Sequence, residues 1–312
     1  MQTPRDWLTP ETLTMLLTID QKGSFAAAAR ALDLVPSALT YRVRQLEDAL
    51  DVLLFDRSAR QARPTAAGQA LLREATRLLS DMDAVANRVR RVATGWEAVL
   101  TVAVDSVVSR TVVMDLCASF LALGTTTKLR LRYETLSGTL AALTSGQADL
   151  VLGAVMTHGL PSDVHHDVLG PIPFVYAVAS HHPLAQAPEP LTDALLQQHR
   201  AVAVADSVSR GAGLTIGLLG GQDVFTVPDM ASKLEAQIRG LGGGFLPESL
   251  ARPYIESGLL VAKTVQKPRI SNCHYAWRDS KQAPAGQALR WWLSQLERLA
   301  TRNALLQPVH RV

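Results

Sequence analysis

Near the start of the chain, three short segments carry apolar residues at helical spacing. The first covers residues 10–21, and its leucines share one face. The second covers residues 24–32, where the hydroxyl of Ser24 can accept from N–H groups of the first turn. The third covers residues 36–50, with Pro36 in the first turn, where its missing N–H costs nothing. This pattern predicts three helices, the first packed under the other two.

The second and third segments have the spacing of a helix-turn-helix. The third carries an apolar stripe that would face the second, formed by Leu39, Val43, Leu46 and Leu50. The rest of its surface, mostly near its start, carries small polar and basic residues. In a helix-turn-helix the second helix lies in the major groove with such residues against base edges and phosphates. We therefore expect a double-stranded DNA operator as a partner, contacted by Pro36, Ser37, Thr40, Tyr41, Arg42 and Arg44.

A basic stretch follows the predicted helix-turn-helix. Residues 52–55 are apolar without a helical period, and residues 56–63 then hold Arg57, Arg60 and Arg63. A hairpin with a basic tip in this place is a wing, whose arginines suit phosphates or the minor groove. The alternative is a solvated surface turn, and the helix pair in front of it favours the wing.

A long amphipathic helix is predicted from Thr65 to about Ala93. Its apolar positions are separated by 4, 3, 4, 3, 4 and 3 residues, which is a heptad seam. The alternative to pairing between two copies is a helix packed on its own chain. We expect pairing, and hence a homodimer or homotetramer, through Leu71, Ala75, Leu78, Met82, Val85, Val89 and Val92.

The pattern changes from Ala98 onward to alternating strands and helices. Strands are predicted at 99–104, 128–134 and 149–154, with one helix starting at Asp105–Ser106 and another over 136–145. This order is typical of an α/β lobe with a parallel sheet. Residues 170–179 would cross into a second lobe, whose elements are expected at 192–198, 200–205, 224–227, 230–238 and 259–261. A strand at 270–277 and a closing helix over 286–302 complete the chain.

Two α/β lobes joined by two crossings form a clamshell, and the cleft between the lobes is the natural ligand site. Ser106 begins a predicted helix, and helix N-termini attract anions, although a plain helix cap is the alternative. Asp206 and Ser207 end a strand of the second lobe and are candidates to face the cleft, with Phe174 and Pro228 as candidate wall residues. A small-molecule effector is therefore expected as a second partner.

Composition narrows the function classes. The 312 residues indicate two domains or three, 47% of them are hydrophobic, and the formal net charge is only +3. The DNA hypothesis therefore rests on the local placement of arginines. No apolar run has transmembrane length, and the first residues lack the pattern of a signal peptide. With Cys117 and Cys273 far apart in apolar contexts, reduced thiols and a cytoplasmic location without membrane contact are expected.

Motifs for catalysis, metal binding and cofactor binding are missing from the sequence. The histidines at 165, 166, 181, 182 and 274 lack helical metal spacing. The glycine-rich residues 240–245 do not fit GxGxxG, and neither a GK[ST] loop nor a GxSxG elbow occurs. The sequence predicts no enzyme, no metal and no cofactor.

The N-terminal motifs resemble those of the LysR-type transcriptional regulators. SFAAAARAL, PSALTYRVRQLEDAL, LLFDR and RPTAAGQALL match that family's signature in order and spacing over roughly residues 8–94. The chain departs from it at Val35 and Pro36, where members often carry serine and then glutamine, and at Tyr41, where arginine is common. The operator sequence therefore cannot be carried over from a relative.

The C-terminal half is similar to the family in pattern, and so to periplasmic solute-binding proteins. The resemblance implies effector contacts at the turn of Ser106 and shortly after the second strand, at Thr135, Leu136 and Ser137. Family members usually have serine or threonine at the position of Leu136. The resemblance also implies RNA polymerase as a partner.

The expected fold is an all-α winged helix-turn-helix with a long linker helix, followed by an α/β two-lobed domain like a periplasmic binding protein. The boundaries are 1–64 for DNA binding, 65–94 for the linker and 95–312 for effector binding, with lobe I at about 95–167 and 268–312 and lobe II at about 168–267. The expected function is transcription regulation through sequence-specific DNA binding, modulated by an effector. The alternative is a solute-binding protein that uses the clamshell alone; it should have a secretory signal and no basic winged N-terminus.

Overall fold

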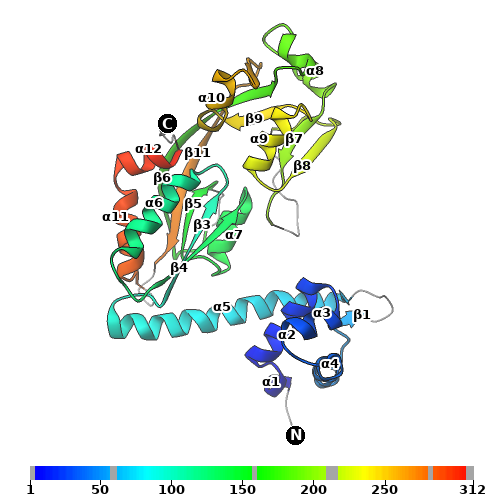
Figure 1. The fold of residues 1–312 in the computed structure, drawn as a ribbon. Coiled ribbons are helices and arrows are strands. Elements are labelled where there is room, and N and C mark those ends of the chain that lie inside the picture. Colours follow the sequence, from blue (N-terminus) through cyan, green and yellow to red (C-terminus); the bar gives the residue numbers. More distant parts are fainter. Residues whose placement is uncertain (1–3, 57–61, 157–159, 209–216, 280–283, 307–312) are drawn as a thin grey trace. The chain divides into compact units, whose positions relative to one another are not determined.

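The computed structural model describes residues 4–56, 62–156, 160–208, 217–279 and 284–306 (Figure 1). Arg57 and Arg60 of the predicted wing lie outside these ranges. The chain divides into two compact units, residues 1–86 and 87–312. Helix α5 (Ala66–Thr94) belongs to both, because the division falls within it.

The first unit contains the predicted helix-turn-helix. The three helices expected from the apolar pattern are α2 (Pro10–Lys22), α3 (Phe25–Ala31) and α4 (Pro36–Leu50), and a short helix α1 (Pro4–Trp7), which was not predicted, precedes them. The wing strands β1 (Phe55–Asp56) and β2 (Arg63–Pro64) pair antiparallel. The winged helix-turn-helix fold is thus confirmed.

Local chemistry accounts for the helix boundaries. The Ser24 hydroxyl accepts from the N–H of Ala27 at the start of α3, as expected. Val35 occupies the equivalent position before α4, where its side chain cannot accept a hydrogen bond, and Pro36 starts the helix instead. The predicted stripe of α4 turns inward, with Leu39, Val43 and Leu46 fully buried against α2 and α3 and Leu50 half-buried.

The wing is tied to the helices by a buried carboxylate. Glu47, on the inner face of α4, accepts from the backbone N–H groups of Leu54, at 2.8 Å, and Phe55, at 3.3 Å. The first turn of α5 packs closely against the backbone at Leu54. A β-carbon on Gly68 would lie 2.0 Å from the carbonyl oxygen of Leu54. Only glycine allows this approach.

The predicted heptad seam of α5 has a buried first part and an exposed second part. Ala75 is fully buried within its own unit, and Leu71 is half-buried against the same core. Pairing at Ala75 was therefore wrong, since a partner cannot reach a side chain that its own unit covers. Five later positions are exposed, and a seam open to a partner starts with them: Leu78, Met82, Val85, Val89 and Val92.

The second unit is built on one seven-stranded sheet. Its core strands β3 (Val99–Asp105), β4 (Lys128–Glu134) and β5 (Leu150–Ala154) are parallel, as predicted. The late strand β11 (Arg269–Arg278) inserts antiparallel beside β5, so the sheet is mixed rather than parallel throughout. Strand β6 (Val164–Ala179) pairs antiparallel with β11, and these two long strands run from one lobe into the other.

Helices cover both faces of the lobe I sheet (Figure 1). Helices α6 (Arg110–Leu121) and α11 (Gln287–Leu296) pack on one face, where Phe120 and Trp292 are fully buried. Helix α7 (Ser137–Thr144) packs on the other face, where its Leu143 and Val151 of β5 belong to one buried cluster.

Two helices of lobe I differ from the predictions. Helix α6 begins at Arg110 and is capped by Ser109, not by Ser106, because residues 105–109 form a turn in which the Asp105 carboxylate accepts from the N–H of Val107. The closing helix is two helices, α11 and α12 (Leu299–Leu306), separated at Glu297–Arg298.

Lobe II contains the remaining elements. A two-stranded parallel sheet of β7 (Ala201–Val204) and β8 (Val224–Val227) lies beside α9 (Met230–Ile238). Strands β9 (Gly244–Pro247) and β10 (Leu260–Lys263) both pair with β6, and η1 (Pro183–Gln186), α8 (Asp193–Gln197) and α10 (Glu248–Glu256) complete the lobe. The sequence did not predict α10, which contains Pro253.

Candidate functional site

The outer face of α4 carries the predicted recognition residues. Pro36, Ser37, Tyr41, Arg42 and Arg44 are exposed, while Thr40 is half-buried and donates its hydroxyl to the carbonyl oxygen of Pro36, at 2.8 Å. Because that hydroxyl is engaged within the helix, Thr40 offers mainly its methyl group outward. Arg63 is exposed at the start of β2.

The two arginines of α4 are available to a partner. Neither Arg42 nor Arg44 forms an ion pair with any residue that the structure describes. An exposed guanidinium without a carboxylate neighbour suits a phosphate or the hydrogen-bonding edge of guanine. Gln45, which was not among the predicted recognition residues, donates its amide to the Tyr41 hydroxyl at 2.6 Å. Its place one helical turn after Tyr41 could have indicated this pairing.

Hydrogen bonds between the two lobes engage four predicted effector residues. Thr135 donates its N–H to the hydroxyl of Ser207, at 3.0 Å, and its own hydroxyl to the carbonyl oxygen of Ala205, at 2.6 Å. Ser137 donates to the Asp206 carboxylate at 2.6 Å. We call these four residues, Thr135, Ser137, Asp206 and Ser207, the interlobe latch. Their polar groups bond across the lobes in this structure, and none of the four residues lines either of the two cavities described below.

A small cavity of about 60 Å³ lies between the lobes beside the latch. Leu136 and Phe174, two of the predicted effector residues, line it together with Asp105 and Met230. Ser106 and Pro228 are not among its lining residues. Leu136 has a φ of 55° and a ψ of −116°, a backbone conformation that strains any residue other than glycine. Its N–H donates to the Asp105 carboxylate at 2.9 Å, which holds the backbone there.

Asp105 is the titratable group of this cavity. Burial raises the pKa of its carboxyl group to about 7, and the charge of Asp206 acts in the same direction. The N–H groups of Val107 and Leu136 oppose this rise because they stabilise the ionised form. The protonation of Asp105 therefore changes near neutral pH.

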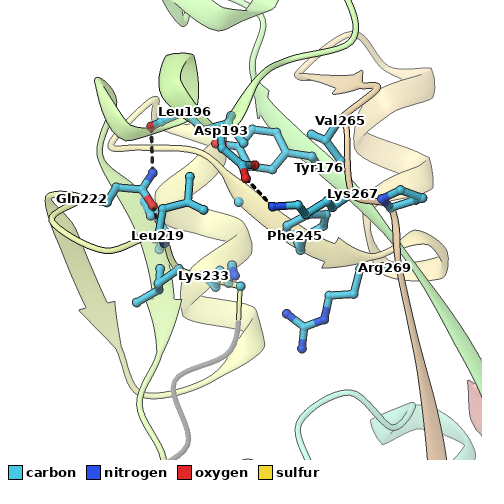
Figure 2. Close-up of a pocket in the computed structure, with 16 residues that line it drawn as sticks. Tyr176, Asp193, Leu196, Leu219, Gln222, Lys233, Phe245, Val265, Lys267 and Arg269 are labelled. Atoms are coloured by element: carbon cyan, nitrogen blue, oxygen red, sulfur yellow. Dashed lines mark hydrogen bonds and ion pairs between the residues drawn. The ribbon is translucent and has the colours of Figure 1, made fainter.

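A larger cavity of about 270 Å³ adjoins the small one inside lobe II (Figure 2). Both cavities are lined by Lys233, Phe245 and Arg269, which mark their junction. The wall of the larger one is mostly apolar, with Tyr176, Leu196, Leu219 and Val265 among its side chains. Lys267 also lines it and pairs with Asp193, as the dashed line in Figure 2 marks.

Two cations meet at the junction of the cavities. Lys233 is only 8% exposed, and its ammonium has no hydrogen-bond or ion-pair partner among the described residues. Burial, and to a lesser extent the charge of Arg269, lower the pKa of Lys233 to about 8. The Arg269 guanidinium lies over the ring of Phe174, 5.0 Å from its centroid. Two neighbouring positive charges without an anion are costly in a partly desolvated site.

The residues of this junction were not predicted from the sequence, although one pattern indicated them. Met230, Lys233, Leu234 and Gln237 follow one another at helical spacing along the buried face of α9. A lysine and a glutamine at core positions of an otherwise apolar stripe are unusual. Arg269 could not be found in this way, because it reaches the site from β11, which is distant in sequence.

Other features of the structure restrict the range of functions. Within the described ranges, no three histidine, cysteine, aspartate or glutamate side chains gather in a metal-binding arrangement. The same ranges contain no helix with both the length and the apolar character needed to span a membrane.

Comparison with known proteins identifies both parts of the chain. Residues 10–69 match the family model of bacterial regulatory helix-turn-helix proteins of the lysR family, and residues 93–300 match the LysR substrate binding domain. The regulator YeeY of Escherichia coli K12, an uncharacterized HTH-type transcriptional regulator, is 35% identical over 286 residues, covering 92% of each chain. AllS of Klebsiella pneumoniae, an HTH-type transcriptional activator, is 31% identical over 258 residues, covering 82% of this chain and 96% of its own.

Solved structures share the fold. CbnR, a LysR family regulator, superposes with a TM-score of 0.58 at 20% identity, covering 94% of this chain and 99% of its own. Full-length LysG from Corynebacterium glutamicum has a TM-score of 0.51 at 22% identity, covering 96% and 100%. The winged N-terminal unit and the two matching family models support the regulator over the solute-binding alternative. The chain belongs to the LysR family of DNA-binding transcriptional regulators, with a C-terminal effector-binding domain.

Proposed function

We propose that this regulator binds its operator through the outer face of α4 and responds to a small molecule held in the cavities of its second unit. The main support is the contrast between the two faces of α4: the inner face is buried, while the outer face presents Tyr41, Arg42 and Arg44 without ion-pair partners among the described residues. Ser37 and Thr40 complete the surface placed against base edges, and Arg63, Arg57 and Arg60 provide the wing contacts to phosphates.

Salt-dependent binding tests the contact surface. Each phosphate contact releases counterions, so Arg44→Ala should lower the slope of log affinity against log salt by about one unit. Arg130→Ala, which removes an exposed arginine from β4 in the second unit, is the matched control and should leave the slope unchanged. An unaltered slope for Arg44→Ala would remove this residue from the interface.

Specificity is tested at Tyr41. Its exposed ring can meet the thymine methyl by apolar contact. Tyr41→Arg should therefore change the preferred sequence in a selection from randomised DNA while the thermal unfolding of the protein stays the same. Identical selected sequences would contradict a base contact at this position.

We further propose that α5 pairs two copies through Leu78, Met82, Val85, Val89 and Val92, so that the operator has dyad symmetry. These apolar side chains are exposed in the single chain. Leu78→Asp with Val85→Asp should split the oligomer in light scattering and abolish specific binding in a gel shift. Arg73→Asp with Ala86→Asp, at exposed positions off the seam, is the control. An unchanged mass for the seam variant would contradict pairing.

The proposal places the protein in the cytoplasm, without enzymatic activity, acting on RNA polymerase at a promoter. Two buried free thiols, Cys117 and Cys273, suit a reducing compartment. The sign of regulation and the target genes would follow from a genome-wide map of the bound sites.

A further inference from the structure

Buried polar groups without partners lie at the larger cavity and next to it. Besides Lys233 at the junction, the Tyr176 hydroxyl, which lines the larger cavity, has no hydrogen-bond partner among the described residues. The same holds for both amide atoms of Gln237, which lies one turn after Lys233 on the buried face of α9 and lines neither cavity. Gly244 brings these elements together, since a β-carbon on it would lie 3.0 Å from the Gln237 amide nitrogen and 3.3 Å from Cε of Lys233. Buried polar groups in folded proteins are nearly always paired, so unpaired ones beside a cavity favour the binding of a ligand with polar groups.

The charges of the site define what this ligand must supply. Lys233 from α9 and Arg269 from β11 are both cations, and the only carboxylates that line either cavity are Asp105 and Asp193 among the described residues. Asp193 is engaged by Lys267, and Asp105 by the N–H groups of Val107 and Leu136. Neither neutralises the Lys233–Arg269 pair, so the site favours an anion from outside the chain.

The walls define the rest of the ligand. The larger cavity extends from the junction into apolar surroundings, where the rings of Tyr176 and Phe245 meet edge to face with centroids 5.4 Å apart. Leu196, Leu219 and Val265 complete this part of the wall. An apolar body would be desolvated there, while its charged end meets the two cations.

We propose that the effector is an organic carboxylate whose carboxyl group bridges Lys233 and Arg269 and whose aromatic or branched aliphatic body fills the lobe II cavity. A carboxylate matches the fork of a guanidinium and accepts from an ammonium at the same time. This inference rests on the proposed function, because it assigns a chemical class to the effector of the same regulator.

Carboxylate binding should take up protons at alkaline pH. Since the pKa of Lys233 is about 8 in the free protein, the residue is largely neutral at pH 9, and pairing with an anion would recharge it. The groups facing Lys233 do not interfere at this pH. Asp105 is already ionised because its pKa is about 7, Tyr176 stays neutral because burial raises its pKa to about 12, and Arg269 remains charged.

The test uses the full-length protein and a panel of monocarboxylates with six to twelve heavy atoms, such as benzoate and phenylacetate, each paired with its neutral amide. Thermal stabilisation and titration calorimetry measure binding. The acids should bind at least tenfold more tightly than their amides, and at pH 9 calorimetry in two buffers of different ionisation enthalpy should show proton uptake. Lys233→Met should weaken the acids by about 10- to 100-fold and leave the amides unchanged.

Two further variants separate charge from folding. Lys233→Arg keeps the charge and should preserve the preference for acids but abolish the proton uptake, because arginine stays protonated. Lys263→Met removes another buried lysine of lobe II, whose ammonium is held by Glu189 and which lines neither cavity; the ratio of acid to amide affinity should not change.

Several outcomes would overturn the inference: no member of the panel binds, amides bind as well as acids, inorganic phosphate competes as well as the acids, or Lys233→Met leaves the preference intact. A gel shift with selected operator DNA is run in parallel. A protein that binds its operator but fails these tests keeps the proposed function and loses only the carboxylate ligand. A protein that binds carboxylates but no DNA would overturn the proposed function alone.

Discussion

Helices α4 and α9 arrange their charges in opposite ways. In α4 the arginines are exposed and the buried charge is an anion, Glu47, which two backbone N–H groups satisfy. In α9 the buried charge is a cation, Lys233, without a partner among the described residues. An exposed arginine costs little to leave unpaired and suits an extended polyanion such as DNA. A buried unpaired lysine is costly and suits a small anion that can enter a cavity.

The largest expected effect comes from removing the buried carboxylate of Glu47, which accepts from two backbone N–H groups. Glu47→Ala leaves the N–H groups of Leu54 and Phe55 without their acceptor in a buried setting. We expect the free energy of unfolding of the first unit to fall by roughly 2–4 kcal/mol. Urea denaturation followed on that unit measures it, with exposed Asp48→Ala as the control. Equal stability of both variants would mean that water replaces the carboxylate.

The sequence predicted the first unit better than the second for a physical reason. In α4 the apolar stripe of Leu39, Val43 and Leu46 is buried and the polar residues between these positions are mostly exposed, so periodicity alone predicts which face of the helix points outward. Only Glu47 departs from the pattern, and its partners lie in the turn that follows directly. Local sequence therefore contains almost all of that information, except that the burial of Ala75 depends on the core into which α5 packs.

The second unit depends on contacts between distant segments. Ser106 and Ser109 are both plausible helix caps, and the Asp105 carboxylate, which turns the backbone at Val107, decides between them. Helix α10 was missed because Pro253 is normally a helix breaker. The latch residues were selected as effector contacts, yet Ser137 and Asp206 bond to each other across the lobes, which no periodicity reveals.

Asp105 is a further buried titratable group, and it forms no ion pair with any residue that the structure describes. Its folded-state pKa of about 7 lies above the ordinary value of 3.8, so the folded state binds more protons than the unfolded state between these pH values. The stability that this group contributes is therefore present at acidic pH and lost as the pH rises through about 7. From pH 5 to pH 8 the loss should reach roughly 2–3 kcal/mol.

The measurement is the unfolding free energy of the second unit across this pH range, compared between the wild type and Asp105→Asn. The comparison is needed because burial lowers the pKa of His182 and His274, and these histidines change stability with pH in the opposite direction. Asp105→Asn should lose the downward slope with rising pH. Parallel curves for the two proteins would contradict a raised pKa at Asp105.

Removing the buried charge of Lys233 should increase stability. Lys233→Met keeps most of the side chain's length and removes the buried charge, so the ligand-free second unit should become more stable by about 1–2 kcal/mol at pH 7. Thermal unfolding without ligand measures the change, and Lys267→Met, which breaks the ion pair with Asp193, should give no such gain. A loss of stability in Lys233→Met would mean that the ammonium is already satisfied.

The smallest expected effect concerns the interlobe latch, which connects the two lobes around the Lys233 site. Ser137→Ala removes the hydrogen bond to the Asp206 carboxylate, worth about 1 kcal/mol at a half-buried position. The lobes should then open about fivefold more often, which hydrogen exchange reports at the N–H of Thr135, bonded across the lobes to Ser207. Ser145→Ala is the matched control, because the Ser145 hydroxyl donates to the carbonyl oxygen of Ala142 within lobe I.

If opening is the route by which an anion reaches Lys233, Ser137→Ala should also speed carboxylate association, whereas Ser145→Ala should not. Faster exchange at Thr135 without faster association would show that the ligand enters the lobe II cavity by a path that leaves the latch closed.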